Sequence, residues 1–176
     1  NLLLKYLGEQ REVPSEIKGA VAISVPCQLA DSLEQLLRFK NALYAKRFKG
    51  NLIEKLRLKQ QLYPELILDN DIENIKTLKD FDDIYTSKAH GFKDAMDYYS
   101  QSSSLQFLEY IKVPTLIINA LNDSFLGKEC YPVDIAQKHK NLYLELPKYG
   151  GHVGFYGENN FTYTEKRTLE FLDNIV

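Results

Sequence analysis

The hydrophobic and polar positions of this chain form three short apolar runs separated by stretches with helical spacing. Each run is rich in Val, Ile and Leu and is bounded by Pro, Gly or polar residues, which predicts a β-strand. The predicted strands cover residues 17–25, 115–120 and 141–146. Because residues 20–25 are apolar on both faces, the first strand is typical of a parallel strand covered by helices on both sides.

Helical patterns flank these strands. A short helix ends near Gly8, another covers about residues 132–140, and a last one runs from about Thr164 to Ile175. Strands that alternate with helices predict the α/β class, with three parallel strands and flanking helices.

A long insertion separates the first two predicted strands. It contains roughly ninety residues, whereas an ordinary crossover needs about a dozen. Its apolar positions fall at 33, 36, 37, 43, 44 and 48 and again at 52, 53, 56 and 62. This spacing predicts two helices with Gly50 between them. Shorter helices are predicted at residues 72–78, 81–85, 92–99 and 105–110.

We expect residues 31–110 to form a helical cap over the carboxyl ends of the strands, inserted into a partial α/β domain that covers residues 1–176. The side chains expected to face inward and to line an apolar pocket are Leu36, Leu37, Leu43, Tyr44, Leu52 and Leu56.

Charge is uneven within this cap. Residues 40–59 hold seven basic side chains and one acid, whereas residues 69–83 hold six acids. A basic amphipathic face could meet an anionic membrane surface or a phosphorylated head group. The favoured interpretation is a pair of solvated helix faces that attract each other, and contact with a membrane surface is the less favoured one.

Composition indicates a folded globular chain, since 44% of the residues are hydrophobic, 26% are charged and the mean hydropathy is −0.33. A net charge of −2 argues against a nucleic-acid partner. The two cysteines, Cys27 and Cys130, form no disulfide framework, so a reducing cytoplasm is the expected compartment. With three histidines and no H-E-x-x-H motif, no metal site is expected.

Two polar residues follow the last two predicted strands. Asp123 comes directly after the second strand, and His152 lies in a glycine-flanked loop after the third. Carboxyl ends of parallel strands meet at one edge of a sheet, so the two side chains are expected to come together there. A serine hydroxyl needs an imidazole to take its proton, and the imidazole needs a carboxylate to hold its tautomer.

Asp123 and His152 are therefore the candidate catalytic residues, as orienter and general base. Taken alone, each has an ordinary structural interpretation, since an Asp after a strand can be a helix cap and a His in a glycine loop can be a surface group. The nearest rivals for the orienting role are Asn122, which has no charge, and Asp134, which lies too far past the strand.

Several segments carry a resemblance to a known family. Residues 114–123 read P-T-L-I-I-N-A-L-N-D, and residues 150–155 read G-G-H-V-G-F. Together they resemble the YheT-like branch of the α/β-hydrolase superfamily, a group of esterases and lipase-like serine hydrolases. Residues 1–8, 17–26 and 90–103 are similar to further parts of that fold, so the resemblance spans the chain.

The resemblance implies the C-terminal half of a hydrolase, starting just after the nucleophile elbow. No G-x-S-x-G motif occurs in the chain, which begins with Asn and has its single Met at position 96. The nucleophilic serine is therefore expected upstream of Asn1, in an N-terminal half of the same fold. Cys27 lacks the glycine turn of a nucleophile, and we expect a buried, inert thiol.

The function implied by the resemblance is hydrolysis of carboxylic esters, with a small ester or lipid substrate, an acyl-serine intermediate and no cofactor. The alternative is a non-catalytic module of the same fold that binds a ligand or a protein. We expect residues 1–176 alone to be inactive.

Overall fold

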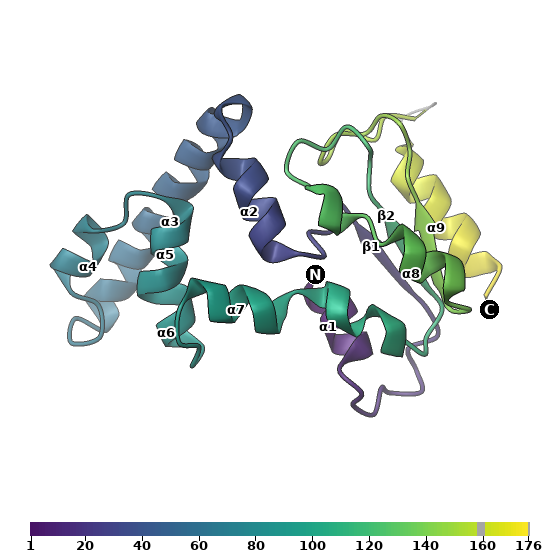
Figure 1. Ribbon diagram of the computed structural model, residues 1–176, viewed down its shortest axis with the longest axis horizontal. Helices are drawn as coiled ribbons and strands as arrows, with labels where there is room; N and C mark the ends of the chain where they lie inside the picture. Colours follow the sequence, from purple (N-terminus) through teal and green to yellow (C-terminus); the bar gives the residue numbers. More distant parts are fainter. Residues whose placement is uncertain (158–160, 176) are drawn as a thin grey trace. The chain divides into compact units, whose positions relative to one another are not determined.

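Three parallel strands form the sheet of the computed structural model, which describes residues 1–157 and 161–175. The strands are β1 (Ala20–Ile23), β2 (Thr115–Ile118) and β3 (Leu142–Glu145), in the order β1-β2-β3. Ala20 is in register with Thr115, and Thr115 with Leu142. The α/β class and the three parallel strands with flanking helices are confirmed (Figure 1).

The chain divides into two units. The first combines Asn1–Ser32 with Ser102–Val176 and contains the sheet, and the second is the helical segment Leu33–Gln101. The helical segment therefore enters the sequence between β1 and β2, where the long insertion was predicted.

One face of the sheet packs against three helices. They are α1 (Leu2–Gly8), η3 (Ser104–Tyr110) and α8 (Val133–Lys138), and η3 is a 3₁₀ helix. Ala22 and Ile117 meet Leu4 and Leu108, which are fully buried. Between β2 and α8 lies η4 (Lys128–Cys130), one further 3₁₀ turn.

The opposite face packs against α9 (Tyr163–Asp173). Leu116 and Ile118 contact Phe155 and Phe171 in a second buried cluster. Since alternate residues of β2 enter the two clusters, the strand is buried on both sides, as expected for a parallel strand between helix layers. In the part of the chain that the structure describes, β1 is an edge strand.

The helical unit contains a long helix and several short ones. After α2 (Leu29–Leu37) and η1 (Phe39–Asn41) comes α3 (Ala42–Leu62), followed by α4 (Asp69–Glu73) and α5 (Leu78–Phe81). A π-helical turn, η2 (Asp82–Thr86), leads into α6 (Ser87–Ala89) and α7 (Ala95–Ser102). The core of the unit gathers Leu56, Ile67, Ile72, Ile75 and Phe81.

The predicted helix break at Gly50 is wrong, since α3 is continuous through this position. A Cβ added at Gly50 would meet no atom within 4 Å, so the glycine lies on an open helix surface. An interior glycine costs only about 1 kcal/mol relative to Ala, and the helix formers on both sides outweigh it. The break falls instead at η1, before Ala42.

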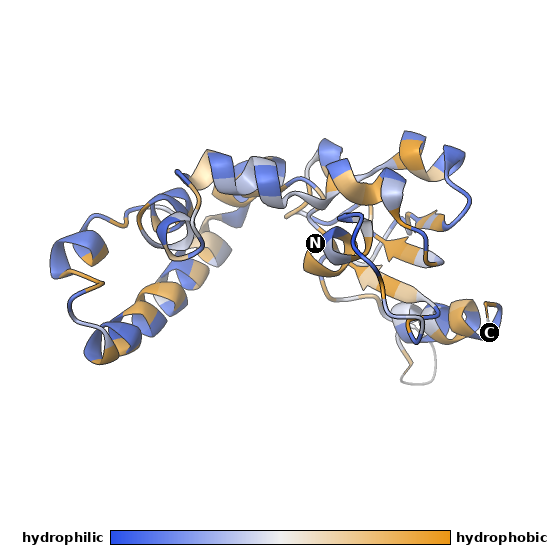
Figure 2. Cartoon of the chain, turned by 90° about the horizontal axis from the view of Figure 1, so that it is seen from below, coloured by the Kyte–Doolittle hydropathy of each residue, from blue (hydrophilic) through white to orange (hydrophobic). Residues whose placement is uncertain are grey.

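Burial along α3 is also uneven, and Figure 2 shows hydrophobic and hydrophilic turns mixed along the helix. Leu56 is buried and Leu52 packs against the same core, whereas Leu43 is 83% exposed. Leu37 and Tyr44 are exposed as well. Their expected place in the lining of an apolar pocket stays a prediction. The hydrophobic core of the unit contacts α3 in its second half, at Leu52, Ile53 and Leu56.

The helix predicted at residues 72–78 is displaced. Its place is taken by α4, which ends at Glu73, and by α5, which begins after Thr77. Thr77 accepts a hydrogen bond from the Asp80 amide, so it is an N-cap and stops the preceding segment from continuing as one helix.

Among residues 1–157 and 161–175, no helix combines the length and the apolar character needed to cross a membrane.

A charged cluster joins β3 to α9. Arg167 Nε donates to both carboxylate oxygens of Glu145, at 3.0 Å each, and Tyr163 Oη donates to the same carboxylate at 2.8 Å. Hydrogen bonding with Arg167 is the main cause that lowers the pKa of Glu145 below its ordinary value of 4.5. The ionised carboxylate is therefore favoured in the folded state.

We predict that Arg167→Met in the intact protein lowers the free energy of unfolding by about 1 kcal/mol at pH 7, as for a partly exposed bidentate pair. Because the folded-state pKa of Glu145 is lowered, this contribution is present above pH 4.5 and is lost as the pH falls through the lower folded-state value. Urea unfolding of the wild type and the variant at pH 7 and below pH 4 measures the loss of stability and its dependence on pH. Lys166→Met, which removes the same charge from an exposed neighbour on α9, is the control, and an equal loss in both variants would contradict the prediction.

Candidate active site

Asp123 lies in a tight turn after β2. Its amide donates to the Ala120 carbonyl at 3.1 Å, and its side chain is completely buried. One carboxylate oxygen, Oδ1, accepts from the Phe125 amide at 2.9 Å. A buried carboxylate requires such donors, because burial without them would disfavour its charge.

The structure brings Asp123 and His152 together. The second carboxylate oxygen, Oδ2, lies 2.8 Å from His152 Nδ1. Since an ionised carboxylate only accepts hydrogen bonds, Nδ1 donates to it, and in the neutral form of the ring Nε2 is then the nitrogen with a free lone pair. The His152 side chain is 37% exposed, whereas the Asp123 side chain is not exposed at all. The imidazole is therefore accessible from solvent, and the carboxylate lies behind it in the protein.

The loop that carries His152 makes a sharp turn after β3. Gly151 has a φ of +56°, in the left-handed region that glycine adopts without a steric penalty. A Cβ at Gly150 would lie 2.6 Å from the Phe155 ring, so only glycine fits there without a shift. The His152 ring packs on Phe125 with centroids 4.8 Å apart. The loop is thus held against the turn that carries Asp123.

Two further polar residues hold this loop from neighbouring strands. Ser24 Oγ donates to the His152 carbonyl at 2.6 Å, and Asn122 Oδ1 accepts from the Gly151 amide at 2.8 Å. Ser24 has a φ of +53°, which is rare for a serine, and it ends β1 before the predicted limit at residue 25. Sequence analysis missed Ser24; the available signal was a polar residue at the carboxyl end of an apolar strand.

Asn119 is a second residue that sequence analysis missed. It is fully buried, and its side chain accepts from the Val25 amide at 2.7 Å. Its amide nitrogen donates to the carbonyls of Cys130, at 2.8 Å, and Val25, at 3.1 Å. This one side chain therefore joins the segments that follow β1 and β2 at the edge where His152 and Asp123 lie.

The two cysteines are buried. Burial is the main cause that raises the pKa of Cys27 to about 12, and the nearby Cys130 adds to it. Cys27 is therefore a neutral thiol at physiological pH and belongs to the core on the α1 side of the sheet. This environment does not suit a nucleophile, which needs the thiolate.

Among the described residues, no hydrogen bond given by the structure links His90 or His139 to Asp123 or His152. His139 Nδ1 accepts from the Asn141 amide at 3.1 Å, and its Nε2 lies 3.2 Å from the Glu109 carbonyl, so both nitrogens serve the backbone. His90 is exposed after α6. Within residues 1–157 and 161–175, no group of three His, Cys, Asp or Glu side chains is arranged to hold a metal ion.

The amino-acid sequence is similar to those of several known proteins. The protein named putative esterase YheT of Escherichia coli K12 is 31% identical over 143 residues, which cover 80% of this chain and 42% of that protein. The human protein named monoacylglycerol lipase ABHD2 is 28% identical over 196 residues, covering 100% of this chain and 44% of that protein. A yeast protein named medium-chain fatty acid ethyl ester synthase/esterase 2 is 33% identical over 99 residues, covering 56% and 22%.

The chain is related to the α/β-hydrolase superfamily, including its YheT-like branch. No protein-family model matches it, and no solved structure matches it. The chain spans less than half the length of these curated relatives. The relationship agrees with the parallel sheet and with polar residues at its carboxyl edge.

We predict that Asn119→Leu destabilises the intact protein by about 3 kcal/mol, because it leaves the Val25 amide and two buried carbonyls without their partner. Chemical denaturation measures the loss. Asn51→Leu, at an exposed position of α3, is the matched control and should change the free energy of unfolding by less than about 0.5 kcal/mol. A similar effect of both variants would show that the Asn119 bonds do not support the fold.

Proposed function

We propose that this chain supplies the acid and the base of a serine hydrolase that cleaves carboxylic esters. The observation that carries the proposal is the 2.8 Å contact between the buried Asp123 carboxylate and His152 Nδ1. It lies at the carboxyl ends of neighbouring parallel strands, where open α/β sheets bind ligands.

The arrangement suits nucleophilic catalysis by a serine. Asp123 keeps the proton on Nδ1 of His152, so Nε2 takes the proton of a serine hydroxyl while the oxygen attacks the ester carbonyl. The imidazolium then gives this proton to the leaving alcohol, and an acyl-serine remains. Water, activated by the same Nε2, releases the carboxylic acid. Asp123 stabilises the imidazolium in both steps.

We place the serine in a segment upstream of Asn1. Two observations support this part of the proposal: the chain spans less than half of its relatives, and β1 has an open edge in the described residues. A further strand that pairs with β1 would cover the edge and bring its own carboxyl end next to His152. The N-terminal half of the fold is thus the proposed partner of this sheet.

The proposed substrate is a small ester or a lipid ester, in line with the esterase and lipase names of the relatives. We also propose that residues 31–110 act as the cap that selects the acyl chain, since this segment enters between β1 and β2. Buried, unpaired cysteines suit a reducing cytoplasm as its compartment.

We predict that His152→Ala and Asp123→Asn each lower kcat for a p-nitrophenyl ester by on the order of 10⁴-fold in the intact protein. His152→Ala removes the group that accepts the serine proton, and Asp123→Asn removes the carboxylate that keeps the proton on Nδ1. Steady-state kinetics measure the effect. His90→Ala removes an exposed imidazole from the helical unit and should leave kcat within about twofold. Equal activity of all three variants would refute the assignment.

The alternative, a binding module without chemistry, has its own test. Residues 1–176 expressed alone should not turn over the ester, and the protein extended upstream through the elbow should. If the extended protein has no serine at the elbow and does not turn over the ester, the binding module is the correct interpretation. Turnover by residues 1–176 alone that His152→Ala abolishes would instead locate a nucleophile within this chain.

A further inference from the structure

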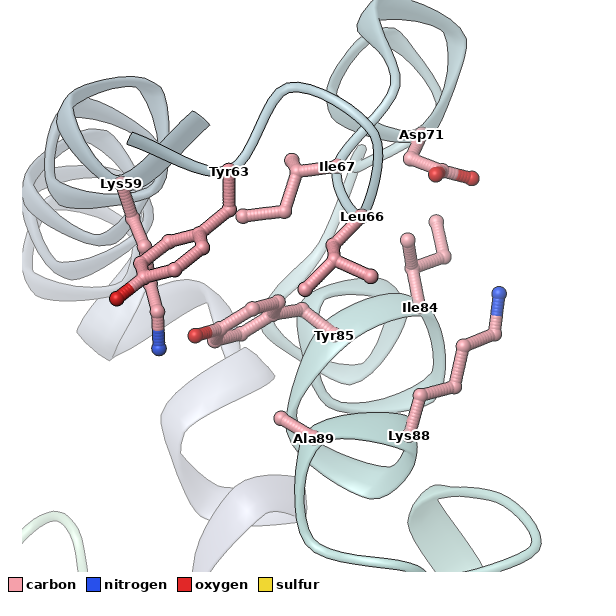
Figure 3. A pocket seen from close by; sticks show the side chains of 9 residues that line it. All are labelled: Lys59, Tyr63, Leu66, Ile67, Asp71, Ile84, Tyr85, Lys88 and Ala89. Atoms are coloured by element: carbon pink, nitrogen blue, oxygen red, sulfur yellow. The ribbon is translucent and has the colours of Figure 1, made fainter. Parts of the chain in front are cut away.

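The helical unit contains a pocket of its own. Its volume is about 480 Å³, within the range of small-molecule sites, and residues of α3, the following loop, α4, η2 and α6 line it. Figure 3 shows the lining side chains. All of them belong to Leu33–Gln101, so the pocket is complete within this unit.

One end of the pocket is cationic and rich in hydroxyls. In Figure 3 the Lys59 ammonium lies at the same end as the hydroxyls of Tyr63 and Tyr85. Lys59 Nζ lies 5.4 Å from the centre of the Tyr85 ring, and hydrogen bonding with Tyr85 is the main cause that raises the pKa of Lys59. Lys59 is charged at neutral pH like any exposed lysine, and the two phenol groups are available as further donors.

The middle of the pocket is apolar. Ile84 and Leu66 line it between the two polar ends, and Leu66 is 73% exposed. The loop that carries Leu66 is tied back to α3, because Gln60 Nε2 donates to the Ile67 carbonyl at 3.0 Å. Together with Ile84, Leu66 gives the middle of the pocket the apolar lining that is typical of small-molecule sites.

The wall that carries Ile84 and Tyr85 is a π-helical turn, a rare geometry that occurs often at functional sites. Hydrogen bonds hold it on both sides: Tyr99 Oη donates to Asp82 at 2.6 Å, and the Ala95 amide donates to Asp83 at 2.8 Å. Tyr85 also packs on Phe81, with ring centroids 5.5 Å apart. These contacts position the wall before any ligand binds.

The far end of the pocket carries Lys88 and Asp71. The Asp71 carboxylate accepts from the Leu68 amide at 3.3 Å, so it serves the start of α4. The lining thus holds two cations and one acid, with an excess of positive charge.

We propose that this pocket binds a small amphipathic carboxylate, of the class of medium-chain fatty acids. Lys59 and the phenol of Tyr85 would bind the carboxylate, and the chain would lie along Ile84 and Leu66. The inference is independent of the ester hydrolysis proposed above, because it concerns binding within the helical unit and requires no turnover.

Calorimetric titration of the intact protein with octanoate, 1-octanol and octylammonium tests the proposal. Octanoate should bind at least tenfold more tightly than either of the other two probes, which share its chain and lack its negative charge. Lys59→Met should weaken octanoate binding at least tenfold and remove its advantage over octanol. Tyr85→Phe, which keeps the ring and its packing, should weaken octanoate binding about threefold.

Lys55→Met is the matched control, since Lys55 lies on the same helix one turn earlier, is exposed and does not line the pocket. It should bind octanoate like the wild type. The proposal is overturned if Lys59→Met and Tyr85→Phe both bind octanoate with unchanged affinity, because the carboxylate would then bind elsewhere. It is also overturned if the wild type binds octanoate and octylammonium with equal affinity. Circular dichroism of each variant shows whether a loss of binding comes from a loss of structure.

Discussion

The burial of β2 on both faces is the constraint on which the rest of the sheet unit depends. Leu116, Ile117 and Ile118 are at most 1% exposed, so the strand has no solvent to satisfy its backbone and depends on its two parallel neighbours. The polar side chains that are buried directly after β2, Asn119 and Asp123, must find partners within the protein. The chain meets this requirement at the carboxyl edge of the sheet, with side chains that bond to backbone groups of adjacent loops.

This requirement explains the order of the candidate site. Asn119 binds the backbone after β1, Asn122 binds the loop after β3, and Asp123 binds its own turn and His152. The loops after three strands are thus linked through one short segment. His152 is thus held in place by the fold itself, which is the condition that the proposed acid–base chemistry requires.

The helical unit is stabilised by a smaller core that covers only part of its longest helix. Its core lies where the second half of α3 meets α4, α5 and η2, and the apolar side chains of the first half are left exposed within the unit. The π-helical turn is tolerated because Asp82 and Asp83 accept hydrogen bonds from α7. The same turn presents Ile84 and Tyr85 to the pocket, so an irregularity of the backbone and a cavity coincide.

The amino-acid sequence by itself determined the features that depend on local pattern. Apolar runs locate the three strands to within a few residues, and the position of Asp123 and His152 after two of them places both at one edge, since parallel strands share their direction. The tertiary structure decided what depends on packing between distant segments. Gly50 reads as a helix break, yet its open surroundings and its helix-forming neighbours let α3 continue. Ser24 and Asn119 are ordinary polar residues in the sequence, and they become supports of the His152 and Asp123 loops because the sheet brings together segments about a hundred residues apart, Ser24 with His152 and Asn119 with Val25.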